Sequence, residues 1–497
     1  MLVMTAVLTA CHNAKVPEQF TDIKKAPCIY PDYTDVTIPV NIAPLTFELE
    51  DSCNEMVARF TIDGYELVCG GVAVQPEMDE WRELVNRAVG KDINVEVFAR
   101  IHEEWKRYQP FHITVSADSI DPYLSYRLIS PSYVAYEELT LNQRRLENYD
   151  EQVMVNNMLC SEEITGQCVN CHNYQQYNPQ RMQFHARQFH GGTVIAYDGK
   201  LRKINMRNDS ILSAGVYPAW HPWLPLIVYS TNTTRQNFHT RNANRIEVYD
   251  SESDMIAYDV ENNEVTNIEN DSTEFEVFPV WAPDGKTLYY CSAHFEFRDT
   301  TSHMSQVIRR YREVKYNIYK KSFNPDTYEF GPRELVFQAD SVGDDGMSAT
   351  LPRLSPDGRF LMFTMGHYGV FHIWHREADL YLLDLTSGQV RAMDEINSKE
   401  TESYHAWSSN GHWVVFSSRR DDGNYTRPFF AHIDANGKGS KPFELPQADP
   451  DYHRQFMKCY NIPEFMRGPV EVMPQEFASV LKASDGEPVK YVPKLRK

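Results

Sequence analysis

Residues 278–292 read FPVWAPDGKTLYYCS, and this stretch decides the fold. Its Asp284-Gly285 pair predicts a tight turn, because glycine accepts the positive φ that such a turn requires. The apolar residues alternate after the turn, from Leu288 onward, which is typical of a strand with one buried face. The stretch therefore predicts a β-hairpin, with Trp281 placed to pack between neighbouring sheets.

Three further segments share this pattern of an aromatic or apolar residue, a tryptophan or leucine, a turn and alternating apolar residues. They are YPAWHPWLPLIVYST from Tyr217, LPRLSPDGRFLMFTM from Leu351 and YHAWSSNGHWVVFSS from Tyr404. An outer strand pair such as DLYLLDLTSGQVRAM follows each, and four strands in a repeated unit are typical of a β-propeller blade. The sequence predicts four clear blades within residues 193–446, with five or six also compatible, and a split blade at 191–209 that closes the ring.

The segments on either side of the repeats complete a mainly β protein with several parts. Residues 12–44 are proline-rich and predict a tether. Residues 45–117 alternate with period two around one helical stretch, MDEWRELVNRAV, which favours a small immunoglobulin-like β-sandwich. Residues 118–192 predict a helical connector, with a helix near 137–157, and residues 447–497 form a C-terminal extension.

The N-terminus and the composition predict the location of the chain. Residues 1–11 end in Leu8-Thr9-Ala10-Cys11, which resembles the lipobox of bacterial lipoproteins, with Cys11 as the lipidated residue. The formal net charge of −20 disfavours nucleic acid as a partner, and the chain lacks the run of about 18 apolar residues that spans a bilayer. We therefore expect a lipid-anchored protein of the cell envelope, on the periplasmic or surface side of the outer membrane, with an envelope protein as its partner.

The stretch EITGQCVNCHNYQQ holds Cys168, Cys171 and His172 in the Cys-x-x-Cys-His spacing of c-type haem attachment. In that chemistry, the two thiols reach the two vinyl groups of one porphyrin edge, and the histidine becomes the proximal ligand of the iron. The motif predicts one covalent haem c, with Cys168 and Cys171 as the thioether positions and His172 as a metal ligand.

The second axial ligand and the other uses of the cysteine pair stay open. Met182, His185 and His190 are the nearby candidates, and position alone favours His185 as the metal ligand. The pair also fits a disulfide in an oxidising compartment, half of a zinc site that lacks a second Cys-x-x-Cys, or a redox dithiol without a surrounding thioredoxin-like pattern. Among the remaining cysteines, Cys53 and Cys69 flank a predicted hairpin and are the expected disulfide.

The repeats resemble the propeller of TolB, a periplasmic protein of Gram-negative envelopes, over residues 191–446. The whole chain resembles a family of bacterial lipoproteins that join a TolB-like propeller to an upstream Cys-x-x-Cys-His motif. The resemblance is carried by segments such as YPDYTDVTIPVNIAPLTF, IDPYLSYRLI, CVNCHNY and SYHAWSSNGHWVVFSSRRDDG. Such proteins are often labelled as related to cytochrome c biosynthesis, so the resemblance implies a haem-bearing envelope protein.

Two functions are compatible with these patterns. The first is envelope electron transfer or redox sensing through a covalent haem c. The second is a non-enzymatic propeller module that binds a protein or glycan partner, with the Cys168–Cys171 pair as a structural disulfide. The sequence holds no Gly-x-Ser-x-Gly and no complete phosphate loop, so it offers no catalytic residue for an enzyme. The propeller histidines are expected to cap loops and fill gaps between blades; they are His221, His294, His367, His372, His375 and His405.

Overall fold

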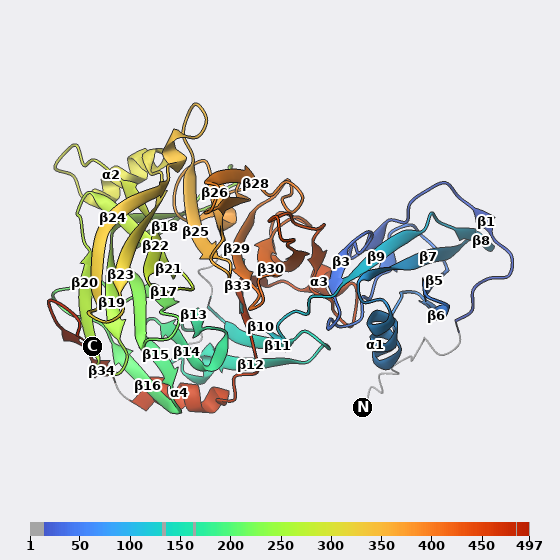
Figure 1. Cartoon of the computed structure of the whole chain (residues 1–497), viewed down its shortest axis with the longest axis horizontal. Helices are drawn as coiled ribbons and strands as arrows, with labels where there is room; N and C mark the ends of the chain where they lie inside the picture. Colours follow the sequence, from blue (N-terminus) through green and yellow to red (C-terminus); the bar gives the residue numbers. More distant parts are fainter. Residues whose placement is uncertain (1–13, 132–135, 163–165, 484, 497) are drawn as a thin grey trace.

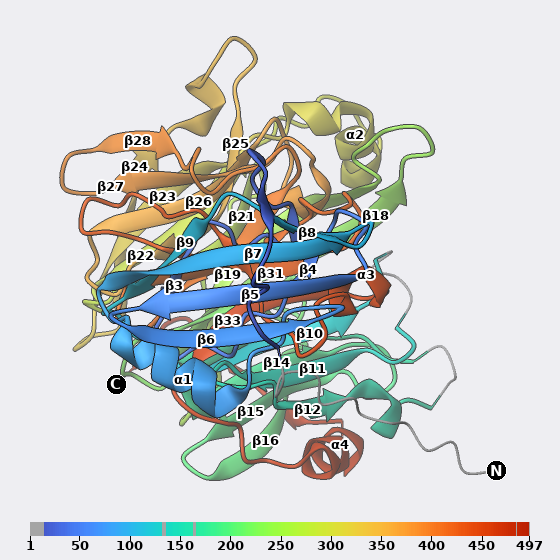
Figure 2. The ribbon, with the colours of Figure 1, turned by 90° about the vertical axis from the view of Figure 1, so that its right-hand side faces the viewer.

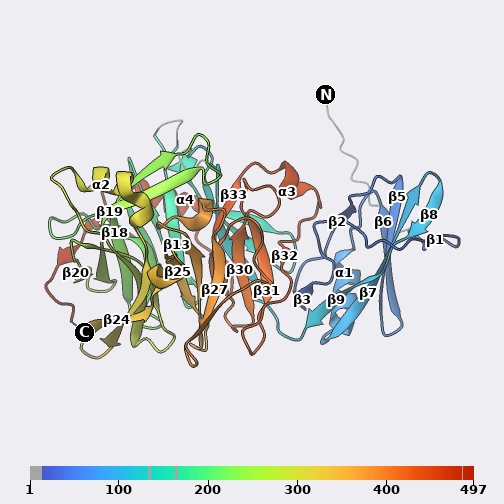
Figure 3. The same ribbon diagram turned by 90° about the horizontal axis from the view of Figure 1, so that it is seen from above.

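The chain folds into two parts, a small N-terminal sheet domain and a larger β-propeller beside it (Figures 1 and 3). The computed structural model describes residues 14–131, 136–162, 166–483 and 485–496. Residues 1–11, including the expected lipidation site Cys11, lie outside the described part of the chain. Within the described part, no helix is long and apolar enough to cross a membrane.

The N-terminal domain is built on one seven-stranded sheet. Its strands are β1 (Thr21–Asp22), β8 (Glu104–Arg107), β7 (Lys91–Ile101), β5 (Glu55–Ile62), β6 (Tyr65–Gly71), β9 (Phe111–Ser116) and β3 (Thr37–Pro39). The expected helix is present as α1 (Met78–Arg87) and lies beside β6 (Figure 2). Its Trp81 is fully buried and meets Phe60 of β5 edge to face at 6.1 Å.

The arrangement of this domain differs from the two facing sheets of the immunoglobulin-like sandwich that the alternating pattern suggested. Besides the main sheet, the described strands β2 (Ile29–Tyr30) and β4 (Glu48–Leu49) form only a short pair. Helix α1 and the segment 36–49 cover the apolar side chains of the sheet instead, and the same core continues into Trp413 of the propeller. Period-two alternation identifies a half-buried strand, but it does not tell which element covers its buried face.

The four sequence repeats are four blades of a β-propeller, as predicted. Their inner strands are β17 (Val216–Trp220), β21 (Glu274–Trp281), β25 (Ser348–Leu354) and β29 (Glu402–Trp407). Each inner strand is followed by three further strands that pair antiparallel in succession. They are β18 (Leu226–Phe238), β19 (Ile246–Asp259) and β20 (Glu264–Glu269); β22 (Thr287–His294), β23 (Asn317–Asn324) and β24 (Glu329–Phe337); β26 (Phe360–Gly366), β27 (Asp379–Asp384) and β28 (Gln389–Ala392); and β30 (Trp413–Ser418), β31 (Arg427–His432) and β32 (Phe443–Glu444).

Two more sheets complete the ring. One holds β13 (Val169–Gln175), β14 (Asn178–Ala186), β15 (Gly192–Tyr197) and β16 (Lys200–Asn205). The other joins β33 (Cys459–Met466) to β10 (Tyr123–Ile129), β11 (Thr140–Arg145) and β12 (Glu151–Asn156). The inner strands follow one another around the ring as β13, β17, β21, β25, β29 and β33, and β33 lies beside β13. The described chain therefore forms six blades, of which the last is closed by a C-terminal strand.

This closure corrects three sequence predictions. The expected helix near 137–157 is absent: the segment forms β11, β12 and one short 3-10 turn. The expected connector at 118–192 is largely propeller, and the segment 191–209 belongs to a complete blade rather than a split one. The misleading feature is polarity, because Asn142, Gln143 and Arg144 of β11 are all buried and hide the alternation of a strand.

The C-terminal extension, residues 447–497, holds more than the closing strand. It also contains α3 (Tyr452–Gln455), α4 (Pro474–Ala483), and the short edge strands β34 (Glu487–Pro488) and β35 (Lys490–Tyr491). Strand β34 pairs with β16 and β35 with β20, so the tail fastens the outer edges of two blades.

Cys53 of the N-terminal domain carries a free thiol, so the expected Cys53–Cys69 disulfide is not formed in this structure.

Candidate functional site

The Cys-x-x-Cys-His motif lies on an inner strand, at a position that all six blades repeat. Each inner strand has a bulge with one residue at positive φ, between 46° and 54°. These six residues, the bulge ring, are Cys171, Tyr217, Phe278, Leu351, Tyr404 and Ile462. The residue that follows is proline or histidine in every blade, namely His172, Pro218, Pro279, Pro352, His405 and Pro463. The last two residues of the motif are therefore one copy of the propeller repeat.

The bulge ring closes the central channel of the propeller. A cavity of about 20 Å³ remains there, lined by the bulge ring together with neighbours such as His172, Asn173 and Arg353. The rings of Tyr217 and Phe278 meet edge to face at 4.5 Å and fill much of the remaining space. Since one water molecule needs about 10–15 Å³, this space holds little more than a single water.

His172 is buried in this constriction, with 1% of its surface exposed. Neither ring nitrogen makes a hydrogen bond of ordinary geometry within the described part of the chain, although the backbone of Ile462 lies near enough to favour the charged ring. Burial, aided by the positive charge of Arg127, lowers the pKa of His172 to about 3. The imidazole is therefore neutral at physiological pH, which is the form that binds metals.

The two thiols lie close to His172 and are almost fully enclosed. Cys168 is 5% exposed and Cys171 is 3% exposed, and both are free thiols in this structure. Burial raises the pKa of Cys171, although the nearby Arg187 opposes the shift. A buried thiol with a raised pKa is a poor nucleophile, so Cys171 differs from the exposed thiolate of a redox-active dithiol.

A porphyrin does not fit these residues as they are placed. The orphaned imidazole of His172 has the chemistry of a metal ligand, but the cavity beside it has a volume of only about 20 Å³. Ligand sites for molecules of this size occupy about 300–1,000 Å³. Strand β13 also pairs on its outer side with β14, and its inner side faces the bulge ring. The haem attachment at Cys168, Cys171 and His172 stays a prediction, and no chemical step is derived through it.

The structure does not bring the expected second ligand to His172. His185 lies on β14, and its Nδ1 is 3.1 Å from the Thr193 hydroxyl. It lines a different cavity, of about 790 Å³, whereas Met182 is buried in the propeller core. His190 lies 3.1 Å from a carboxylate oxygen of Glu162. Three candidates that are near in sequence are therefore directed to three separate environments.

Below the bulge ring, the channel is polar. Asn173 donates to both carboxylate oxygens of Glu464, at 2.9 and 3.2 Å. Burial raises the pKa of Glu464 to about 7, against the opposing effect of Arg353 and of the Asn173 hydrogen bond. This end of the channel opens into a hollow of about 190 Å³ on the face that carries the Asp-Gly turns.

The opposite face of the propeller, here called the upper face, carries the longer connections between strands. A hollow on this face, the upper cleft, has a volume of about 1,150 Å³ and is formed by five loops. These loops join β18 to β19, α2 (His303–Arg310) to β23, β24 to β25, β26 to β27, and β28 to β29. Many of the lining residues carry polar or charged groups; they include Asn242, Asn244, Arg312, Lys315, Asp345, His367, Arg376 and Glu377.

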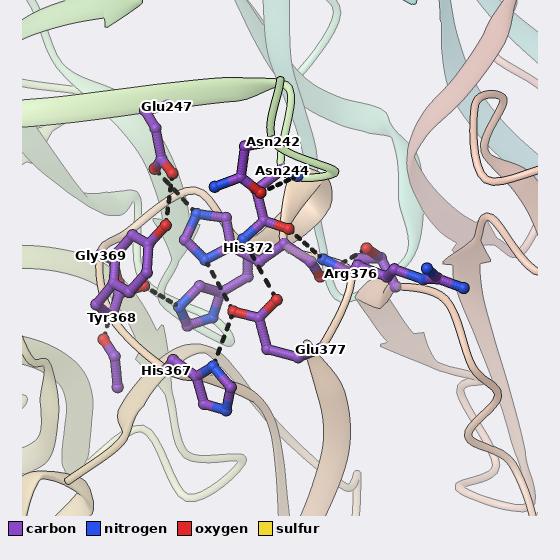
Figure 4. A network of polar contacts seen from close by, with 12 residues as sticks. Asn242, Asn244, Glu247, His367, Tyr368, Gly369, His372, Arg376 and Glu377 are labelled. Carbon is purple, nitrogen blue, oxygen red and sulfur yellow. Dashed lines mark hydrogen bonds and ion pairs between the residues drawn. The ribbon is translucent and has the colours of Figure 1, made fainter. Parts of the chain in front are cut away.

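A hydrogen-bonded network fixes one wall of the upper cleft (Figure 4). Glu247 accepts hydrogen bonds from the Tyr368 hydroxyl at 2.7 Å and from Nε2 of His375 at 3.0 Å. The amide of Asn244 then donates to Glu377 at 3.3 Å and accepts from the backbone N–H of Arg376 at 3.0 Å. The tip of the β18–β19 loop is thereby held against the β26–β27 loop.

The charge of this network is fixed by burial and hydrogen bonding. Burial by itself would raise the pKa of Glu247, but hydrogen bonds and charge from His375, Tyr368 and His239 outweigh it and lower that pKa. Behind it, burial lowers the pKa of His372 to about 3, and its ring bonds to Thr350 at 2.9 Å. The hydrogen bonds restrain Glu247, Tyr368 and Asn244 and so preorganise this wall of the cleft. Among the described residues, Nδ1 of His375 and Oε1 of Glu377 have no hydrogen-bond partner.

The other propeller histidines have different hydrogen-bond partners. His221 and His405 bond to backbone carbonyls of neighbouring blades, at 2.9 Å each, which agrees with the expected role of filling gaps between blades. His375 instead belongs to the network of the upper cleft. Glu247 and Glu377 carry no sequence motif, and their partners come from separate blades, so sequence reasoning did not identify them.

A second cavity on the upper face carries positive charge. It is the hollow of about 790 Å³ that His185 lines, and it is also lined by Arg187 and Arg207. Both arginines are exposed, and neither forms an ion pair with a carboxylate of the described residues. Their charge, after burial, contributes to lowering the pKa of His185 to about 3.

Comparisons with known proteins add little to this picture. No family model matches the chain, and no curated protein matches it. A prolyl oligopeptidase B from Galerina marginata is similar at 10% identity and a TM-score of 0.36, over 66% of this chain and 44% of its own length. The chain thus spans less than half of that protein.

Two glycosidase structures are similar at the same level. An endo-arabinase from Bacteroides thetaiotaomicron has 10% identity and a TM-score of 0.22, over 54% of this chain and 89% of its own. An ancestral GH74 enzyme has 10% identity and a TM-score of 0.33, over 87% and 64%. At these scores, the similarities carry no inference about function.

Proposed function

We propose that this protein is a propeller binding module that takes a glycan on its upper face. The observation that carries the proposal is the upper cleft of about 1,150 Å³, whose polar wall is fixed by the Glu247 network. The volume suits an oligosaccharide, since sites for smaller ligands occupy about 300–1,000 Å³. A rigid wall favours binding, because fewer side chains lose freedom when the ligand arrives.

The lining of the cleft favours a glycan over a protein segment. Amides, carboxylates and cations alternate around it, so it offers both donors and acceptors to sugar hydroxyls, which themselves donate and accept. A protein partner of comparable affinity needs an apolar centre, with aromatic anchors that fill pockets. The second cavity supplies Arg187 and Arg207, whose planar guanidiniums suit acidic groups on the same ligand.

Lipid attachment at Cys11 would present this face at the cell envelope. The proposal needs no haem and assigns Cys168 and Cys171 to the packing of the channel. It also needs no catalytic residue, because the cleft is assigned only to binding.

The proposal is tested by probing the full chain on an array of neutral and acidic oligosaccharides, followed by titration calorimetry with the strongest hit. We expect Asn244→Ala and Glu377→Gln to weaken binding at least tenfold, which corresponds to about 1.4 kcal/mol. The matched control is Glu471→Gln, an exposed glutamate outside the cleft, which should bind like the wild type. An array without hits, or cleft variants that bind like the wild type, would contradict the proposal.

A further inference from the structure

One cluster of metal-ligating side chains lies away from both the channel and the upper cleft. It consists of Asp118, His412 and His432, whose ligand atoms all lie within 4.8 Å of one another. Among the described residues, it is the one group of three histidine, cysteine or carboxylate side chains placed closely enough to share a metal ion. Asp118 follows β9 of the N-terminal domain. Both histidines belong to the propeller blade of β29, His412 directly before β30 and His432 at the end of β31.

Both imidazoles direct the same nitrogen at one carboxylate. Nε2 of His432 is 2.9 Å from Oδ2 of Asp118, and Nε2 of His412 is 3.7 Å from Oδ1. The two rings are nearly parallel, with an interplanar angle of 10° and centroids 6.2 Å apart. Zinc binds histidine at about 2.0–2.1 Å and carboxylate at about 2.0–2.2 Å, so its ligand atoms lie about 3–4 Å from one another.

The surroundings hold the carboxylate in place. The backbone carbonyl of Asp118 accepts from Nε1 of Trp413 at 3.0 Å, and its Oδ2 accepts from the Ser116 hydroxyl at 3.2 Å. The ring of Trp413 meets His432 edge to face at 5.0 Å. All three ligands are partly exposed, so a cation can enter and retain water at its open positions.

The repeat pattern shows that the histidine is a local departure. The residue directly after the Asp-Gly turn is Lys286 in the blade of β21 and Arg359 in the blade of β25. In the blade of β29, the residue directly after the Asn410-Gly411 turn is His412, whose imidazole faces Asp118. The cation that two other repeats carry at this position, Lys286 or Arg359, is thus replaced by an imidazole, which can bind a metal.

We propose that Asp118, His412 and His432 form a zinc site that clamps the N-terminal domain onto the propeller. Two imidazoles and one carboxylate are ligands that Zn²⁺ prefers, and a water molecule completes a four-coordinate site. The segment 118–121 is already fastened to this blade, since Asp121 accepts hydrogen bonds from the backbone N–H and the hydroxyl of Ser409, both at 2.6 Å. Zinc would strengthen a junction that the protein already makes.

The test is titration of ZnCl2 into the chelator-treated full chain, by calorimetry, together with melting curves with and without zinc. We expect one zinc per chain and a higher melting temperature with zinc. His412→Gln, His432→Gln and Asp118→Asn should each weaken binding at least tenfold and abolish the rise. The matched control is His294→Gln, which removes another histidine paired with a carboxylate, at 3.1 Å from Glu274, and should bind zinc like the wild type.

A second readout uses Co²⁺ in place of zinc. The proposal expects visible absorption bands from a four-coordinate cobalt site, lost in His432→Gln, and slower proteolysis of the linker at 117–122 when the metal is bound. Melting curves without metal show whether each variant folds. A wild type that binds no zinc, or three ligand variants that bind it as tightly as the wild type, would overturn the proposal. This outcome is independent of the upper cleft, whose variants leave these residues unchanged.

Discussion

The propeller blades of β13 and β29 carry a histidine at the same position of their inner strands, but only the histidine of β13 belongs to a recognised sequence motif. His172 on β13 follows Cys171, and His405 on β29 follows Tyr404; in both pairs the first residue has positive φ. Both imidazoles are buried, and burial lowers the pKa of each to about 3. Nε2 of His405 lies 2.9 Å from the carbonyl of Met362, whereas His172 has no hydrogen-bond partner in the described chain.

The comparison shows that the Cys171-His172 end of the motif coincides with a repeated position of the propeller. In β13, the spacing of the thiol and imidazole groups follows the bulge of an inner strand, which recurs in all six blades. A repeat that tolerates cysteine at the bulge and histidine after it needs one more cysteine upstream to complete the pattern. The unusual feature of β13 is therefore its small thiols and its orphaned imidazole, rather than the spacing itself.

The largest expected effect compares two members of the bulge ring. Phe278→Ala should lower the free energy of unfolding by about 3–5 kcal/mol, because a buried aromatic ring is replaced by a cavity. Cys171→Ala removes one sulfur atom at the equivalent position and should cost about 1 kcal/mol. Urea unfolding of the full chain measures both. An equal loss for the two variants would show that Cys171 does more than fill its place in the ring.

A proline substitution tests the equivalence more sharply. Four of the other five blades have proline where β13 has His172, namely Pro218, Pro279, Pro352 and Pro463. We expect His172→Pro to change the free energy of unfolding by less than about 1 kcal/mol, since the repeat accommodates the fixed φ of proline. His405→Ala should cost about 1–3 kcal/mol, because the buried carbonyl of Met362 loses its partner.

These two variants are compared by urea unfolding in the same buffer. If His172→Pro unfolds the protein while His405→Ala is tolerated, the two positions are not equivalent, and His172 has a role of its own. Wild-type circular dichroism of both variants would confirm that each retains the β-sheet content before its stability is compared.

A smaller, pH-dependent effect is expected below the bulge ring. The folded-state pKa of Glu464 is raised to about 7, chiefly by burial, above the ordinary 4.5. The unfolded chain therefore releases this proton first, so the folded state loses stability as pH rises from about 4.5 to 7, and the loss is constant above that. Glu464→Gln removes this dependence, and it should stabilise the protein more at pH 8 than at pH 5.

Thermal melting of the wild type and Glu464→Gln at the two pH values measures this difference. The exposed Glu471→Gln serves as the control and should show the same difference from the wild type at pH 5 and pH 8. A stabilisation by Glu464→Gln that is equal at both pH values would indicate that this carboxyl is not perturbed by burial.

The sequence predicted the parts of the fold that depend on local patterns. The turn at Asp284-Gly285, its two equivalents at Asp357-Gly358 and Asn410-Gly411, and the similar segment from Tyr217 identified four blades. The sequence did not identify the blade of β13 as complete, because its turn uses Gln176 and Tyr177, with φ of 49° and 62°, in place of Asn-Gly or Asp-Gly. The closing blade joins β33 to strands more than 300 residues earlier in the chain, a long-range pairing that no local pattern reveals.

The candidate sites were predicted less well, for a related reason. The sequence identified Cys168, Cys171 and His172 by their spacing, but their placement in a closed channel depends on five other blades. The upper cleft and the Asp118 cluster assemble side chains from separate loops or domains. Such groups come together only in the folded chain, so they carry no signature in the sequence.

The most direct test of this account is the absorption spectrum of the denatured, reduced protein in alkaline pyridine, after expression in a host that matures c-type cytochromes. The account predicts no haem absorption that survives denaturation, because Cys171 and His172 lie in one inner strand of a closed propeller and Cys168 directly precedes that strand. A sharp band that persists in the denatured chain, and disappears in a Cys168→Ala/Cys171→Ala variant, would contradict it and establish a covalent haem.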